Sequence, residues 1–228
     1  AYTKFVADGW GSVPFDPKYD GQGLPRSISV AVNEMLASAN LSFSLCPLLT
    51  HGAVDLLINH GTEQQKTTYL GKLVSGEWTG TMNLTEPHAG SDVGLLNTRA
   101  LPSGDHYLIK GTKIYITWGE HDMTDNIIHI VLARTPNSPP GTKGISCFIV
   151  PKFLVNPDGS LGERNDLRCT SIEHKLGVRG CPTAVMSYGD VDGAVGYLVG
   201  DECDGMRAMF TMMNAARLDV GLEGVAIA

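Results

Sequence analysis

The sequence has 228 residues, of which 43% are hydrophobic and 18% are charged, and its formal net charge is −7. This composition supplies enough apolar side chains for a core and too little charge for a disordered chain. A net negative charge disfavours binding to a phosphate backbone, so we expect no nucleic-acid partner. No uninterrupted apolar run of 18 residues occurs, which predicts no membrane-spanning helix.

The five cysteines are widely spaced, and no CxxC pair occurs among them. An odd number of cysteines without such pairs is typical neither of a disulfide framework nor of a zinc site. We therefore expect reduced thiols, no metal, and a location in the bacterial cytoplasm or the mitochondrial matrix.

The first part of the chain predicts helices. Residues 1–25 are rich in Gly, Pro, Asp and Tyr, which predicts an irregular lead-in. Apolar residues at helical spacing follow over 28–39. The largely apolar run 41–58 predicts a buried helix that is interrupted near Pro47.

Another helix is predicted by capping signals, and β structure follows it. Thr62 and Gln65 have the layout of a capping box, and Gly76 is suited to end that helix. The pattern then changes to short β segments without helices between them, which predicts an antiparallel barrel or sandwich. The candidate strands are 79–84, 96–101, 106–117, 126–134, 144–150 and 183–191.

A helical pattern returns at Gly205 and continues to Ala228 without a capping signal. The sequence therefore predicts an α+β chain with three parts. They are an incomplete helical N-terminal domain at 1–78, a middle β domain at 79–199 and the first helix of a truncated C-terminal helical domain at 200–228.

The most specific string is Thr-Glu-Pro-His-Ala-Gly-Ser-Asp at 85–92. It reads as a strand that ends in a tight turn, with free backbone N–H groups and flanking hydroxyls. Such a turn can hold a phosphate or the polar edge of a flat ring. Ordinary Gly/Ser loops share this pattern, so the residues alone leave both interpretations open.

Two further strings carry binding chemistry. Tyr115 and Thr117 alternate along a predicted strand, which places an aromatic plane and a hydroxyl on one face. This pair suits a flat heteroaromatic ligand, but the two residues alone favour an ordinary sheet surface, because Tyr and Thr are both good strand formers. Lys175 and Arg179 lie in a Gly-rich turn. Two cations there could bind a phosphate, or the turn could be an ordinary solvent-exposed basic loop.

Asn214 and Arg217 are three residues apart and share a face of the last predicted helix. Arg217 stands in a stretch rich in Met and Ala. We therefore predict that its side chain is half-buried against a partner.

Together these strings resemble the acyl-CoA dehydrogenase family of flavoproteins. The resemblance is carried by 85–92, by Tyr115-Ile116-Thr117 and by 175–180, and it runs from about residue 20 to the end. It implies a helical N-terminal domain, a middle β domain and a C-terminal helix bundle. It also implies FAD as cofactor, an acyl-CoA substrate, an electron-transfer flavoprotein as acceptor, and a homodimer or homotetramer.

The resemblance also implies a role for individual positions. Thr117 matches a hydroxyl that bonds flavin N5, and Tyr115 matches an aromatic packed on the ring. The implied flavin-binding residues are Met82, Leu84, Thr85, Gly90, Ser91, Tyr115, Ile116 and Thr117. The implied substrate-binding residues are Ser91, Met213, Asn214 and Arg217.

Two positions depart from the family pattern. Tyr115 replaces the usual Trp, and Cys181 stands where Ser is common. The string at 115–122 is similar to the longer bacterial members of the family, including those that act on methylthioacyl-CoA.

The implied reaction is α,β-dehydrogenation of an acyl-CoA thioester, which needs a carboxylate base. Some family members carry that base just before the Arg of this last helix, where Ala216 stands here. We therefore expect the base to lie outside these 228 residues and this chain alone to be inactive. The alternatives are a non-catalytic flavin-binding damage-response homologue and an oxidase that uses oxygen.

Overall fold

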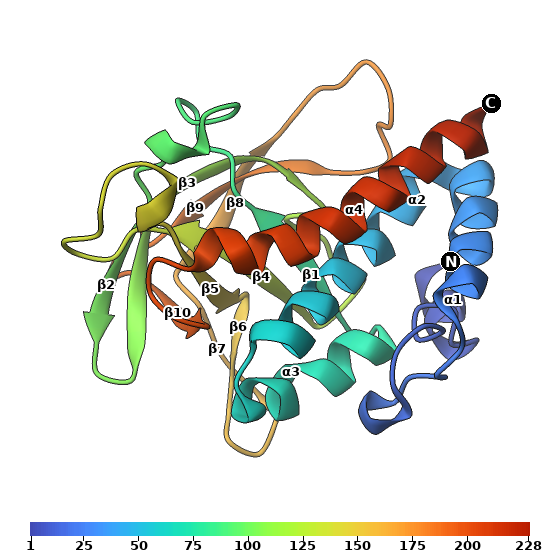
Figure 1. Cartoon of the computed structure of the whole chain (residues 1–228), viewed down its shortest axis with the longest axis horizontal. Coiled ribbons are helices and arrows are strands. Elements are labelled where there is room, and N and C mark those ends of the chain that lie inside the picture. Colours follow the sequence, from blue (N-terminus) through green and yellow to red (C-terminus); the bar gives the residue numbers. More distant parts are fainter.

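The computed structural model describes residues 1–228 as helices packed along one side of a curled sheet (Figure 1). The helices are α1 Tyr2–Ala7, η1 Pro17–Tyr19, α2 Arg26–His60, α3 Glu63–Ser75, η2 Val93–Leu95, η3 Thr142–Gly144 and α4 Gly205–Ile227. The strands are β1 Trp78–Asn83, β2 Arg99–Ser103, β3 His106–Thr117, β4 Asn126–Ala133, β5 Ser146–Pro151, β6 Phe153–Val155, β7 Leu161–Arg164, β8 Leu167–Ile172, β9 Thr183–Tyr188 and β10 Ala194–Val199.

The N-terminal segment is more ordered than its composition predicts. It contains α1 and η1, so the expected irregular lead-in is wrong there. Tyr2 and Phe5 of α1 are buried and pack with Phe43 of α2. Aromatic burial thus stabilises a helix that is too short to form by propensity alone.

Helix α2 breaks at Asn40 (φ −162°, ψ 94°) and not at Pro47, where we expected the interruption. The Asn40 side chain accepts a hydrogen bond from the N–H of Phe43 (3.0 Å) and so caps the second half of the helix. By length and composition α2 meets the criterion for a membrane span, but 72% of its apolar window is buried in the fold. An apolar helix that is mostly buried is typical of a protein core, and α2 packs in the core of this fold.

Helix α3 has the predicted ends. Thr62 Oγ1 accepts from the N–H of Gln65 (3.2 Å), and Gln65 Oε1 accepts from the N–H of Thr62 (3.0 Å). Gly76 ends the helix in the left-handed region (φ 81°). The capping box and the stop are therefore confirmed.

The main sheet has the order β1-β4-β5-β10-β3-β9-β8, and β2 pairs with β3. Its neighbours are antiparallel except for β1 and β4, which are parallel. The purely antiparallel expectation is wrong for this pair, because the long excursion through β2 and β3 returns the chain in its original direction. The short strands β6, β7, β8 and β10 were not among the candidate strands.

Two apolar clusters fill the two sides of the sheet. The larger lies between α2, α3, α4 and the strands β1, β4 and β5. The smaller fills the inside of the curl, with Phe148 and Tyr188 among its fully buried members. The first residue of α4, Gly205, contacts the backbone of β5, so this helix begins directly against the sheet.

We predict opposite effects for alanine at two glycines of α4. A Cβ at Gly205 would lie 2.4 Å from the carbonyl carbon of Ser146, whereas a Cβ at Gly221 meets no atom within 4 Å. Gly205→Ala should lower the free energy of unfolding by about 1–3 kcal/mol through overpacking. Gly221→Ala should raise it by about 0.5–1 kcal/mol through helix propensity. Urea unfolding of the complete protein, followed by tryptophan fluorescence, measures both, and equal shifts would contradict the packing of α4 on β5.

Candidate functional site

The segment 85–92 leaves β1 in a tight turn. Glu86 and Ala89 exchange two backbone hydrogen bonds (3.1 and 3.0 Å), which close the turn around Pro87. The carbonyl of Thr85 accepts from the N–H of Ile114 (2.9 Å), so the turn is joined to β3. The predicted strand-and-turn geometry is therefore present, and it brings segment 82–91 beside segment 113–117.

A buried ion pair lies beneath this turn. Glu86 Oε1 accepts from Lys113 Nζ (2.8 Å), and Lys113 is fully buried while Glu86 is 3% exposed. Lys113 also donates to the carbonyl of Leu84 (2.9 Å). The remaining capacity of the carboxylate is used by the N–H of Asn97 (2.7 Å) and by the N–H and hydroxyl of Thr98 (3.1 and 2.6 Å).

The pair holds both charges at neutral pH. Burial alone would raise the pKa of Glu86, but Lys113 and the hydrogen bonds from Asn97 and Thr98 lower it below its usual value. Burial lowers the pKa of Lys113 to about 8, although Glu86 opposes that shift. Both carboxylate oxygens of Glu86 already accept hydrogen bonds. Glu86 therefore anchors the turn and is not available to take a proton from a substrate.

Tyr115 projects outward because β3 bulges beside it. The register of β3 on β9 shifts between Lys113 and Ile116, and Tyr115 has a left-handed backbone (φ 60°). Lys113 and Ile116 both point inward, whereas Tyr115 is 60% exposed and Thr117 is half-buried. The exposures of Tyr115 and Thr117, on either side of buried Ile116, are consistent with the outer face predicted for them.

The outer surface of these two segments combines apolar side chains with hydroxyl groups. Met82 and Leu84 are partly buried, and Gly90 and Ser91 are exposed. A Cβ at Gly90 would meet nothing nearer than Thr85 Cγ2 at 3.9 Å, so space is open above the turn. None of the four hydroxyls, which belong to Thr85, Ser91, Tyr115 and Thr117, donates or accepts a hydrogen bond within the chain. The positions predicted for flavin thus present apolar side chains, an exposed aromatic ring and hydroxyl groups without partners in the chain.

The positions predicted for substrate lie on α4. Met213 packs against the larger apolar cluster, which Met82 and Leu84 also border. Arg217 donates to Asn214 Oδ1 (2.9 Å) and stacks on Phe210 (5.5 Å), and both polar residues are exposed. The prediction that Arg217 is half-buried is therefore wrong, because its partners lie on the surface of its own helix. Arg217 makes no hydrogen bond to segment 82–91.

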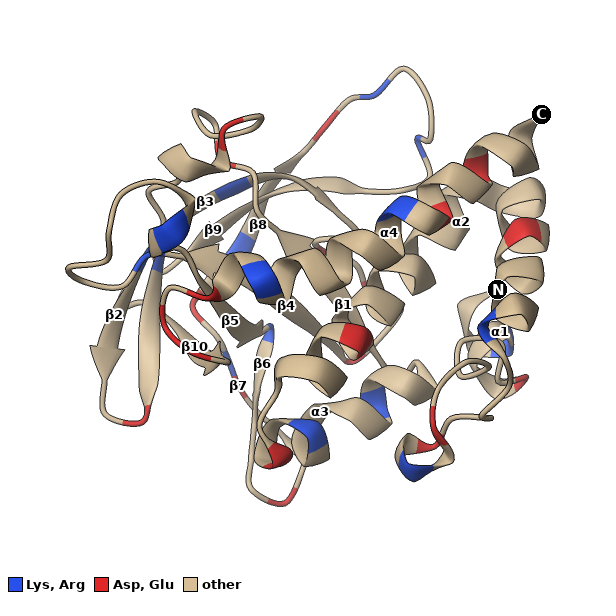
Figure 2. Cartoon of the chain, viewed as in Figure 1, with Lys and Arg blue, Asp and Glu red and all other residues tan.

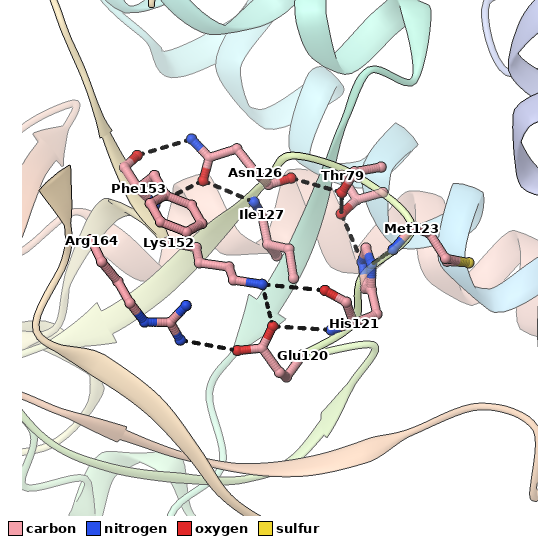
Figure 3. Close-up of polar contacts among 10 residues, drawn as sticks. Thr79, Glu120, His121, Met123, Asn126, Ile127, Lys152, Phe153 and Arg164 are labelled. Carbon is pink, nitrogen blue, oxygen red and sulfur yellow. Dashed lines mark hydrogen bonds and ion pairs between the residues drawn. The ribbon is translucent and has the colours of Figure 1, made fainter. Parts of the chain in front are cut away.

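The segment that follows Thr117 is held by a polar network (Figure 3). Glu120 accepts from Lys152, Arg164 (Nη2 at 3.3 Å) and the N–H of His121 (3.2 Å). Lys152 also donates to the carbonyl of His121 (3.2 Å). Asn126 then joins β4 to Phe153 through both ends of its side chain. The network fixes the far end of the strand that presents Tyr115 and Thr117.

His121 is held in one neutral tautomer. Its Nδ1 accepts from the N–H of Met123 (3.2 Å), so its Nε2 carries the proton and donates to Thr79 Oγ1 (3.0 Å). Burial lowers its pKa to about 4, and the nearby Lys152 adds to the shift. Burial likewise lowers the pKa of the fully buried His129, to about 3, with a further contribution from His121.

Sequence reasoning missed Lys113, Glu120 and Lys152 as site anchors. Lys152 stands within an otherwise largely apolar stretch, which could have indicated its burial, whereas Lys113 shares its strand with the exposed Lys110 and gave no such signal. Their partners are distant in sequence or in another strand. The pairing therefore could not be read from spacing.

Comparison with known proteins identifies related sequences. The description "Acyl-CoA dehydrogenase, N-terminal domain" matches residues 1–77, and "Acyl-CoA dehydrogenase, middle domain" matches residues 81–191. The 3-methylmercaptopropionyl-CoA dehydrogenase of Ruegeria pomeroyi is 54% identical over 229 residues, which cover 100% of this chain and 38% of that protein. A butyryl-CoA dehydrogenase of Syntrophomonas wolfei is 43% identical over 97% of this chain and 37% of its own length.

A solved structure has the same architecture. A structure described as the electron transferring flavoprotein of Acidaminococcus fermentans superposes with a TM-score of 0.85 at 28% identity. The match covers 99% of this chain and 56% of that one. The chain therefore spans less than two fifths of the two relatives above and just over half of this structure.

We predict that Glu86→Gln strongly destabilises the fold. The change leaves the Lys113 ammonium buried without a carboxylate, which should lower the free energy of unfolding by about 3–5 kcal/mol. Urea unfolding of the complete protein measures the effect. The exposed pair Lys72–Glu77 (2.6 Å) supplies the control, because Glu77→Gln should leave the unfolding midpoint unchanged. Equal midpoints for the two variants would contradict the anchoring role of Glu86.

We predict that stability falls as the pH drops below about 6.5. Between that value and pH 4 the unfolded chain protonates His121 and His129, whereas the native chain keeps both neutral. Each site should lower the free energy of unfolding by about 1.4 kcal/mol per pH unit at its steepest. Urea midpoints between pH 4.5 and 7.5 test this. His121→Asn keeps an acceptor for Met123 and should flatten the slope, while the exposed His174→Gln should leave it unchanged.

Proposed function

The chain belongs to the acyl-CoA dehydrogenase family, and we propose that the protein that carries it is an FAD-dependent enzyme acting on acyl-CoA thioesters. The proposed reaction removes a proton from the α carbon and a hydride from the β carbon. The free hydroxyls and the exposed Tyr115 ring on the outer face of β3 and the adjoining turn support it most directly.

Bound FAD supplies the acceptor for the β-hydride. The residues of this chain hold and orient the reactants. In the proposed arrangement Tyr115 packs on the flavin ring, Thr117 donates its hydroxyl to the ring edge, and the turn at Gly90 and Ser91 offers backbone N–H groups to phosphate. The Glu86–Lys113 pair keeps that turn in place without contacting the ligand.

The base that takes the α-proton is proposed to lie outside residues 1–228. Ala216 cannot bind a proton, Asn214 is not basic, and Arg217 stays protonated. Glu86 is committed to Lys113 and to three further hydrogen bonds. A thioester α-proton is weakly acidic, so the base must have a raised pKa and the enolate oxygen must meet hydrogen-bond donors.

Short acyl groups are the proposed substrate class. The two relatives above are named for the butyryl and the 3-methylmercaptopropionyl thioesters, which both have short acyl chains. We also propose an electron-transfer flavoprotein as electron acceptor and a homodimer or homotetramer as the assembly. The cytoplasmic or mitochondrial-matrix location stays a prediction.

Flavin absorbance of the complete protein tests the proposal. The purified protein should show flavin bands that bleach with butyryl-CoA and 3-methylmercaptopropionyl-CoA, and more weakly with palmitoyl-CoA. Oxygen uptake during turnover tests the oxidase alternative, because a dehydrogenase should reduce an electron-transfer flavoprotein much faster than oxygen. A protein without flavin bands, or one that no acyl-CoA bleaches, would contradict the proposal.

We predict that Thr117→Val weakens flavin binding. The change keeps the side-chain shape and removes a hydroxyl that makes no hydrogen bond within the chain. Loss of one hydrogen bond costs about 0.5–1.5 kcal/mol, so the flavin dissociation constant should rise about two- to tenfold. Flavin fluorescence titration of the apoprotein measures it. Thr112→Val, an exposed position on the same strand, is the control, and equal affinities for the two variants would remove Thr117 from the site.

A further inference from the structure

Strand β3 ends in a strained turn directly after Thr117. The N–H of Gly119 donates to the carbonyl of Ile116 (3.2 Å), so Thr117 and Trp118 are the two central residues of a tight turn. Trp118 has a left-handed backbone (φ 52°). A turn with a positive φ at this position normally has Gly or Asn there, because the Cβ of a larger residue approaches the following carbonyl oxygen. A tryptophan keeps this conformation only where its surroundings impose it.

The indole of Trp118 is anchored on helix α2. Its Nε1–H donates to the carbonyl of Ser42 (3.1 Å), two residues after the break of α2 at Asn40. The Trp118 side chain is buried, with 7% of the residue exposed. It belongs to a small apolar cluster whose other buried members are Tyr2, Phe5, Cys46 and Cys181. The side chain therefore joins the end of β3 to the helical part of the fold.

The loop between β8 and β9 holds the backbone of the same turn. The N–H of Trp118 donates to the carbonyl of Pro182 (2.8 Å), which lies at the end of this loop. The loop also reaches α2, since a Cβ at Gly180 would lie 3.2 Å from Ser42 Cβ. Figure 2 shows the loop crossing to that helix, with its basic positions in blue. The backbone and the side chain of Trp118 are thus both fixed by residues far away in the sequence.

The backbone of Trp118 determines the conformation of Thr117. Thr117 is the last residue of β3 and pairs with Thr183 of β9. If the φ of Trp118 returned to a negative value, the peptide between Thr117 and Trp118 would flip, as it does between the two common turn types. Thr117 would then leave the extended conformation, and its side chain would turn away from the outer face of the strand. The left-handed backbone at Trp118 therefore keeps Thr117 in the strand.

We infer that Trp118 is a positioning residue for the Thr117 hydroxyl. The inference rests on the proposed function for the identity of the ligand, because Thr117 is the residue proposed to bond the flavin edge. The anchored indole holds Trp118 in the left-handed conformation, and that conformation aims the Thr117 hydroxyl outward. Trp118 acts through Thr117 and needs no contact with the flavin. The helical part of the chain thereby controls a flavin contact that the β domain makes.

Two substitutions of Trp118 separate positioning from stability. Trp118→Leu keeps an apolar side chain for the cluster, but it removes the N–H donor and disfavours a left-handed backbone. Trp118→Asn places a polar amide in the apolar cluster, but it favours the left-handed backbone. The unfolding midpoint should therefore fall further in Trp118→Asn. Flavin binding should show the opposite order. The flavin dissociation constant should rise about two- to tenfold in Trp118→Leu, as in Thr117→Val, and less than about twofold in Trp118→Asn.

Flavin fluorescence titration of the apoprotein and urea unfolding followed by circular dichroism, both on the complete protein, give the two orders. In a Thr117→Val background the two Trp118 variants should bind flavin equally, because the hydroxyl that Trp118 positions is then absent. Trp10→Leu makes the same change at a tryptophan that is 47% exposed, and it should leave the flavin dissociation constant unchanged. If Trp118→Asn does not fold, Trp118→Gly takes its place, because glycine also accepts the left-handed backbone.

A purely structural role predicts that flavin affinity falls in the same order as the unfolding midpoint, and that result would overturn the inference. An effect of Trp118→Leu that persists in the Thr117→Val background would overturn it as well. In both cases the proposed function stands if the wild type binds flavin and butyryl-CoA bleaches it. A wild-type protein that binds no flavin would instead contradict the proposed function and this inference together.

Discussion

The buried pair between Glu86 and Lys113 is the constraint on which the candidate site depends. A lysine without exposed surface keeps its charge only beside a well-hydrogen-bonded carboxylate. Glu86 reaches that position only if residues 86–89 close into their tight turn. The turn and the middle of β3 are therefore placed together by one interaction. The positions predicted for flavin lie on these same two segments. All of them except Ile116, which is buried and points inward, keep some exposed surface, whereas neither charge is exposed.

The bulge in β3 follows from this burial. A regular strand would project Lys113, Tyr115 and Thr117 to one face, so burying the lysine would bury the aromatic ring as well. The extra residue between Lys113 and Ile116 separates the two, and Tyr115 takes a left-handed backbone conformation as a result. The left-handed backbone of Tyr115 and the burial of Lys113 thus have one cause, the bulge, which also exposes the Tyr115 ring to solvent.

The sequence predicted those features that depend on neighbouring residues. The features that it did not predict depend on contacts between residues far apart in the chain. The ends of α3 followed from Thr62, Gln65 and Gly76 because a capping box involves neighbouring residues only. The parallel pairing of β1 with β4 could not be predicted, since it depends on where a long excursion returns. The flavin positions came from a resemblance carried by short strings. Their anchors were missed because Lys113 meets Glu86 across 27 positions and Glu120 meets Lys152 across 32.

One short segment, residues 94–98, lies between the Glu86 carboxylate and the Arg134 guanidinium. The Glu86 carboxylate accepts from the N–H groups of Asn97 and Thr98, while the Arg134 guanidinium donates to the carbonyls of Gly94 and Leu96. The Glu86 carboxylate thus accepts from backbone N–H groups of this segment, and the Arg134 guanidinium donates to its backbone carbonyls. Opposite charges on its two sides hold a backbone that has little regular structure of its own. Further contacts hold the same segment, since the His88 ring lies 3.1 Å from the carbonyl of Leu95 and the carbonyl of Thr98 accepts from the N–H of Arg134 (2.9 Å). The two charges and these backbone contacts therefore place the segment together.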